Sequence, residues 1–177
     1  WHGGLALSGV LACALFAAVS GSSPATVVAI GSILIPGMIK EGFPMRFGAG
    51  VITTSGALGI LIPPSIVMVM YAIATNTSVG ALFMAGVIPG IVMASMLGGM
   101  TWYRARKFNY PRQPKASWRQ RLSAFRESAW GLMLIIVVMG GIYSGMFTPT
   151  EAAAMSAVYA FVVAVFIYKD IGLKDVP

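Results

Sequence analysis

Hydroxyl side chains gather at two places in a chain that is otherwise strongly apolar. One group lies in "SGSSP" (residues 20–24), and the other lies in "TTSG" (residues 53–56), directly before "ALGILIPPS". Glycine and proline in both stretches interrupt a helix and leave backbone carbonyls without intrahelical partners. Hydroxyl and carbonyl oxygens are hard ligands that suit a small cation such as sodium, and the sequence offers no cluster of buried carboxylates, His or Cys for a divalent metal. The predicted cation ligands are Ser20, Ser22, Ser23, Thr54, Ser55, Gly56, Gly59 and Pro63.

The same two stretches predict helix N-termini that favour an anion. Ser23 before Pro24 is typical of an N-cap followed by proline at the first helical position, and Pro64 with Ser65 is typical of a second helix start. Such a terminus binds a carboxylate through its free N–H groups and the positive end of the helix dipole. We therefore expect an organic anion to contact Ser23, Pro64 and Ser65. Taken singly, each hydroxyl is equally typical of a structural role in a membrane helix, but the pair of breaks favours a binding site.

The composition indicates an all-α integral membrane protein. Hydrophobic residues make up 58% of the chain, charged residues 10%, and the mean hydropathy is +0.84. The net charge of +7 does not indicate nucleic-acid binding, because eight of the twelve Lys and Arg residues lie between Arg104 and Arg126, beside apolar segments. A basic cluster in that position marks the cytoplasmic side of the membrane.

The basic cluster fixes the side of the membrane on which each neighbouring segment begins and ends. Residues 76–113 comprise an external turn, one spanning helix and a cytoplasmic loop. Residues 47–75 run from the cytoplasmic to the outer side as a discontinuous helix, because two glycines and a proline pair interrupt it at 56–65. Each half, of roughly 10 residues, reaches about half of the bilayer thickness.

The first 35 residues predict a re-entrant helical hairpin. Its first helix covers residues 3–19 and its second covers residues 24–35, ended by Pro36. With Lys40 on the cytoplasmic side, the chain enters the membrane, turns at 20–24 near the midplane and returns. A single kinked span over 3–35 is the alternative, and it places the start of the chain outside.

The part after the basic cluster predicts three further helical segments. An amphipathic stretch at 114–127 suits a helix lying in the cytoplasmic interface. Residues 128–177 then form a helical pair that crosses outward and back. In "TPTE" (residues 148–151) Thr148 and Glu151 have the spacing of a capping box, which favours a structural role for this acid.

Three motifs together resemble the large membrane subunit of TRAP (tripartite ATP-independent periplasmic) transporters. They are "SGSSPATVVAIGSILIPGMIKEGF" (20–43), "TTSGALGILIPPSIVMVMYAIATNTSVGALFMAGVIPG" (53–90) and "GGIYSGMFTPTEAAAMSAVYAFVV" (140–163). The resemblance implies an elevator-type fold of the ion transporter superfamily in the bacterial inner membrane, driven by a sodium gradient and without a further cofactor. It also implies a small membrane subunit, a periplasmic substrate-binding protein and organic acids such as C4-dicarboxylates, sialic acid or keto acids.

The resemblance also assigns parts of the chain to regions of that fold. Residues 1–75 become part of the transport domain, residues 114–127 a connecting arm, and residues 128–177 the start of a second repeat. The chain is expected to be an internal fragment that holds about half of a two-fold-related site.

Two other functional classes are alternatives to transport. A serine hydrolase needs a base beside its nucleophile, but the single histidine, His2, lies far along the chain from Ser20 and the apolar runs contain no lysine. We therefore expect no enzymatic activity. A non-transporting membrane scaffold or a channel-like component, in which the breaks only pack, is the alternative to a sodium-coupled transporter.

Overall fold

The computed structural model describes residues 3–111 and 117–168, and within these ranges every regular element is a helix. Five helical segments are long and apolar enough to cross a membrane: Ser23–Lys40, Met45–Thr75, Val79–Lys107, Trp118–Tyr143 and Pro149–Tyr168. This confirms the prediction of an all-α integral membrane protein. The chain divides into two compact units, Trp1–Lys115 and Ala116–Pro177.

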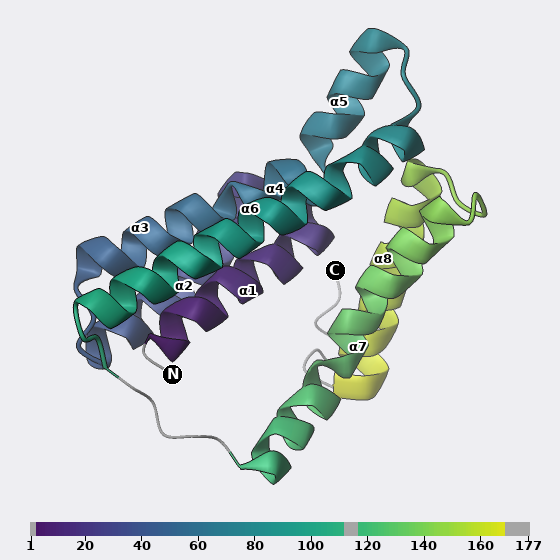
Figure 1. Ribbon diagram of the computed structural model, residues 1–177. Coiled ribbons are helices and arrows are strands. Elements are labelled where there is room, and N and C mark those ends of the chain that lie inside the picture. The colour runs from purple at the N-terminus through teal and green to yellow at the C-terminus, as the bar shows by residue number, and fades with distance from the viewer. Residues whose placement is uncertain (1–2, 112–116, 169–177) are drawn as a thin grey trace. The chain divides into compact units, whose positions relative to one another are not determined.

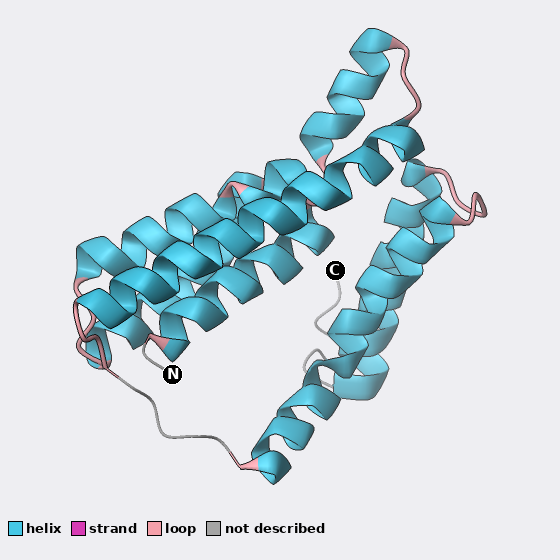
Figure 2. Cartoon of the chain, in the orientation of Figure 1, coloured by secondary structure: helices cyan, strands magenta, loops and turns pink. Residues whose placement is uncertain are grey.

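The first unit is a bundle built on an antiparallel helical hairpin (Figure 1). Its six helices are α1 (Gly4–Ser20), α2 (Ser23–Lys40), α3 (Met45–Gly56), α4 (Leu58–Leu61), α5 (Ile66–Thr75) and α6 (Val79–Lys107). Helices α1 and α2 pack against each other and both pack against α3, while α6 runs along α1, α3, α4 and α5. Only short turns join these helices (Figure 2).

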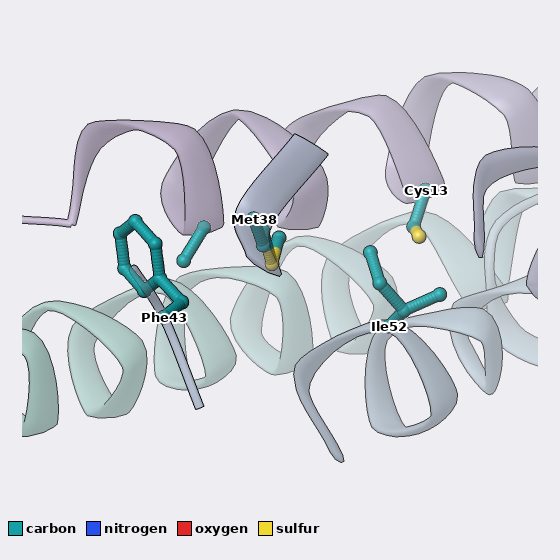
Figure 3. Close-up of a cluster of buried hydrophobic side chains, with 5 residues drawn as sticks. Cys13, Met38, Phe43 and Ile52 are labelled. Atoms are coloured by element: carbon teal, nitrogen blue, oxygen red, sulfur yellow. The ribbon is translucent and has the colours of Figure 1, made fainter. Parts of the chain in front are cut away.

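The core of this unit lies where the hairpin meets α3. Its buried cluster comprises Ala6, Cys13, Met38, Phe43 and Ile52, which come from α1, α2, the following turn and α3 (Figure 3). The aromatic rings of Phe43, which belongs to this cluster, and of Phe47 pack on Tyr110, which follows α6. Their ring centroids lie 5.5 and 4.7 Å from the centroid of the tyrosine ring. Aromatic pairs at these distances stabilise the packing of the α2–α3 turn against the end of α6.

Two helix boundaries differ from the prediction. Helix α2 does not end at Pro36 but continues to Lys40, because a proline inside a helix removes only one backbone hydrogen bond and the remaining ones hold the helix together. The interruption predicted over 56–65 is shorter, because α4 forms inside it and leaves only a turn at Ala57 and the four residues 62–65 outside the helices.

The second unit is a helical pair of α7 (Trp118–Tyr143) and α8 (Pro149–Val162), followed by a π-helical turn η1 (Val163–Tyr168). The hydroxyl of Tyr159 donates to the carbonyl of Trp130 at 2.9 Å, and the hydroxyl of Tyr168 donates to the carbonyl of Glu127. The amphipathic stretch predicted at 114–127 is continuous with the following span in α7. Residues 114–116 of that stretch, and residues 169–177 of the predicted pair, lie outside the described ranges.

The capping box predicted before α8 is present. The Glu151 carboxylate accepts hydrogen bonds from the amide and the hydroxyl of Thr148, at 2.8 and 2.9 Å, and the Thr148 hydroxyl accepts from the Glu151 amide at 3.3 Å. A second capping box, between Ser117 and Gln120, begins α7. Glu151 therefore has a structural role at the start of its helix.

Candidate functional site

The tip of the α1–α2 hairpin is held by a small network of hydroxyl groups. Helix α1 ends at Gly21, which has a left-handed backbone conformation (φ 60°), and Ser22 is the N-cap of α2. The fully buried Thr26 hydroxyl donates to the Ser22 carbonyl at 2.9 Å and lies 3.2 Å from the Ser20 hydroxyl. Thr26 is not among the predicted ligands, although its position one turn after the N-cap is the signal that identifies it.

The second break separates α4 from α5. The N-cap of α5 is Ser65, and the four residues 62–65 between the helices are extended or bent. Within the described part of the chain, no hydrogen bond reaches the carbonyls of Ile62, Pro63 and Pro64. These oxygens are the free acceptors that the proline pair was predicted to create.

The two breaks are in direct contact. The amide of Ile66, at the start of α5, donates to the carbonyl of Gly21 at 3.1 Å. A Cβ atom on Gly21 would lie 2.6 Å from the Pro64 carbonyl oxygen, and a Cβ atom on Gly59 would lie 2.8 Å from the Ser23 amide nitrogen. The close approach of these backbones requires glycine at both positions. The structure thus brings the hairpin tip, α4 and the proline loop together.

Three buried hydroxyl groups have no hydrogen-bond partner, namely those of Ser23 and Ser65 at the junction and that of Ser55. Ser55 precedes Gly56, where a Cβ atom would lie 3.4 Å from the Ser23 carbonyl oxygen. Ser55 is fully buried and Ser65 is 1% exposed. Buried polar groups in folded proteins are nearly always paired, and leaving one unpaired costs about 1–3 kcal/mol. A bound cation is one partner that such unpaired hydroxyl oxygens could take. The described residues contain no group of three or more His, Cys, Asp or Glu that could hold a metal.

The junction lies level with the middle of α6. A Cβ atom on Gly86 would lie 2.8 Å from the Leu61 carbonyl, and one on Gly90 would lie 3.0 Å from Ile62. At 1.5 Å per residue, Gly90 is about 16 Å from Val79 and about 21 Å from Arg104. The other ends of the hairpin lie near the C-terminal end of α6, where Gly3 contacts Ala105 and Phe43 contacts Tyr110.

Several predicted ligands occupy other positions, relative to the helix starts or to the junction, than the sequence predicted. Ser22, not Ser23, is the N-cap of α2, and Pro64 precedes the N-cap of α5 instead of starting the helix. Proline fits the first turn at either of two positions, so the cap is ambiguous from sequence. Thr54 lies apart from the junction: its hydroxyl donates to the carbonyls of Gly50 and Val51, and it lines a groove beside α6.

Interrupted helices that meet level with the middle of a spanning helix are typical of one class of proteins, the membrane transporters. The chain matches the family described as "Tripartite ATP-independent periplasmic transporter, DctM component" along residues 1–177, and it belongs to this family. This confirms the resemblance found from the three motifs. Members of this family are multi-pass proteins of the bacterial inner membrane, which agrees with the five candidate spans among the described residues.

Named relatives place the chain more closely within the family. It is 70% identical to the C4-dicarboxylate TRAP transporter large permease protein of Rhodobacter capsulatus, covering 100% of this chain and 43% of the relative. The corresponding protein of Vibrio cholerae is 57% identical, with 97% and 38% covered. An ectoine TRAP transporter large permease protein of Halomonas elongata is 43% identical, with 98% and 41% covered. The chain therefore spans about two fifths of the length of these relatives.

Proposed function

We propose that the complete protein is the large permease subunit of a sodium-coupled TRAP transporter that imports an organic acid. The observation that carries the proposal is the junction of the two breaks through Ile66 and Gly21, with three unpaired buried hydroxyls around it. C4-dicarboxylate is the first substrate to test, because it is named for relatives that are 70% and 57% identical. Sialic acid and keto acids are the further organic acids expected from the family resemblance.

The sodium site in this proposal uses oxygens from both breaks. The hydroxyls of Ser23, Ser55 and Ser65 supply the unpaired side-chain ligands, and the loop carbonyls, including that of Pro63, supply the backbone ligands. Gly56 and Gly59 allow α3 and α4 to approach the start of α2, since a Cβ atom on Gly56 would lie 3.4 Å from the Ser23 carbonyl. Sodium bound there supplies the positive charge that couples its gradient to import of the anion.

The anion site in this proposal lies on the same junction. The first N–H group of α5 already donates to Gly21, so the carboxylate contacts fall to the Ser65 hydroxyl and to the N-terminus of α2 around Ser23. The positive end of the α2 dipole favours the negative charge there. The remaining contacts come from parts of the protein beyond this chain, as the predicted two-fold-related site requires.

We also propose that the α1–α2 hairpin is re-entrant and belongs to a moving transport domain of the elevator type. Three features support this: the antiparallel packing of α1 on α2, the level of the tip at the middle of α6, and the location of both hairpin ends near Ala105 and Tyr110. These contacts support the hairpin rather than a single kinked span over 3–35. The first half of α7 then serves as the connecting arm, and α7 with α8 begins the second repeat. A small membrane subunit and a periplasmic binding protein complete the transporter.

The test is uptake by the complete transporter, with its small membrane subunit and binding protein, in proteoliposomes that carry an inward sodium gradient. The wild-type protein accumulates radiolabelled C4-dicarboxylate above its external concentration, and S23A lowers the apparent sodium affinity. The control is S32A, because the Ser32 hydroxyl lies in the same hairpin but bonds to the Ala29 carbonyl of its own helix. Equal sodium dependence in S23A, S32A and wild type contradicts the sodium site, and equilibration without accumulation favours the channel-like alternative.

A further inference from the structure

A groove between α3 and α6 lies away from the paired breaks and carries a different chemistry. Its volume is about 520 Å³. The walls are largely apolar and include Phe47, Val51, Leu97 and Met100, while Arg46 and Arg104 stand at one end. Arg46 lies in the first turn of α3 and Arg104 in the last turn of α6, so the charged end of the groove is the end that holds the basic cluster.

The two arginines are available to an external anion. Neither forms an ion pair with any residue in the described ranges, and Glu41 is the sole acidic residue between positions 1 and 115. Both side chains are exposed. The Arg104 guanidinium lies 5.8 Å from the centre of the Phe108 ring, which restricts its position beside the groove. The structure thus joins two unpaired guanidinium groups to an unfilled apolar groove.

We infer that this groove binds an anionic phospholipid. The phosphate lies between Arg46 and Arg104, because guanidinium groups bind phosphate oxygens with paired hydrogen bonds. An acyl chain runs along Phe47, Val51, Leu97 and Met100 toward the middle of α6, as the apolar walls require. Basic pockets between spanning helices are a recognised setting for lipid head groups. Free phosphate would engage the guanidinium groups but would leave the apolar walls uncovered.

The groove between α3 and α6 is a separate site from the proposed sodium and anion sites. A lipid in this groove contacts the first half of the discontinuous helix and the continuous helix α6 at once. It therefore stabilises the packing of α3 on α6. The expected consequence is a thermal stability that depends on the head group of the surrounding lipid.

The experiment uses the complete transporter, purified in detergent, and titrates it with phosphatidylglycerol, phosphatidylcholine or inorganic phosphate. Retained lipid is counted by native mass spectrometry, and stability is followed by thermal unfolding. The charge-removal variant is R46Q/R104Q. The matched control is R106Q, because the Arg106 guanidinium lies 5.5 Å from the Trp102 ring and does not line the groove. We expect R46Q/R104Q to lower the affinity for phosphatidylglycerol by on the order of tenfold and R106Q to leave it unchanged.

A second variant, G50L, tests the apolar part of the groove with both charges intact. Gly50 lines the groove, and a Cβ atom there meets no atom within 4 Å, so a side chain can begin there without a clash and extend into the groove. We expect G50L to fold and to lose the retained phosphatidylglycerol. The inference is overturned if R106Q weakens lipid binding as much as R46Q/R104Q does, if inorganic phosphate protects as well as phosphatidylglycerol, or if a photo-crosslinker at Gly50 captures another subunit instead of lipid.

Discussion

The amide of Ile66 donates a 3.1 Å hydrogen bond to the carbonyl of Gly21, which lies far from it in the sequence. This bond joins the first turn of α5 to the residue that ends α1. A backbone amide at the start of a helix has no intrahelical acceptor, so the hairpin tip satisfies a group that the break in the helix exposes. The two interrupted elements therefore depend on each other, and neither is a complete site alone.

Replacing Gly21 by alanine should separate the two breaks. Its φ of 60° is unfavourable for a residue with a side chain, and the new Cβ atom would lie 2.6 Å from the Pro64 carbonyl oxygen. We expect G21A to lower the free energy of unfolding of the complete protein by at least about 1–2 kcal/mol, as measured by denaturation. The control is G37A, where the added methyl meets nothing within 4 Å. Equal stability of G21A and G37A would contradict the contact.

The contact between α3 and α2 can be tested with a double-mutant cycle. A Cβ atom on Gly56 would lie 2.2 Å from a γ-methyl group of Val27, so G56A alone should destabilise the protein. V27A removes the methyl group that causes the clash, and G56A should therefore cost less in a V27A background. We expect a coupling free energy of about 0.5–3 kcal/mol from the four unfolding measurements. Additive effects of the two substitutions would show that α2 and α3 do not pack as described.

The re-entrant hairpin predicts that both of its ends face the same side of the membrane. Cysteine at Gly4 is suitable because an added Cβ meets nothing within 4 Å, whereas one at Gly3 clashes with Ala105. Cysteine at the exposed Glu41 marks the other end, and cysteine at the exposed Thr77 marks the loop between α5 and α6. In a background without Cys13, an impermeant maleimide should label the first two sites from the cytoplasm and the third from outside. Labelling of Gly4 and Glu41 from opposite sides would contradict the hairpin.

The capping box of α8 predicts different effects for two substitutions of its acid. E151A removes the acceptor for the Thr148 amide and hydroxyl and should cost about 1 kcal/mol in unfolding free energy. E151Q keeps an acceptor oxygen and should cost less, since glutamine also forms this motif. Neither change should alter the sodium dependence of uptake. Loss of uptake in E151Q at unchanged stability would instead assign the carboxylate charge to transport.

The breaks were predictable because glycine and proline act locally. Gly21 can adopt the left-handed conformation that ends α1, and the proline pair lacks the N–H groups of a helix, whatever surrounds them. The exact caps were not predictable, because proline fits the first helical turn at more than one position. The prediction that α2 ends at Pro36 was wrong, since a proline removes only one backbone hydrogen bond and α2 continues to Lys40.

Contacts between distant segments could not be derived from the sequence. The hydrogen bond from Ile66 to Gly21 and the closeness of Gly59 to Ser23 depend on how α4 and α5 return to the hairpin. The same holds for Thr54 and Ser55, which are neighbours in sequence but lie on different faces of α3, one beside α6 and the other buried. A hydroxyl pattern alone does not show which of two adjacent residues faces a site.

The central claim is that the unpaired hydroxyls at the junction bind sodium, and the most direct measurement is the effect of sodium on thermal unfolding of the complete protein. A ligand that binds only the folded state stabilises it, by about 2.7 kcal/mol at one hundred times its dissociation constant. We predict that sodium chloride, but not choline chloride, raises the unfolding temperature of wild type and of S32A. The variants S55A and S65A should lose this rise yet match wild type without sodium, because neither hydroxyl has a protein partner. A full sodium-dependent rise in both S55A and S65A would contradict the account.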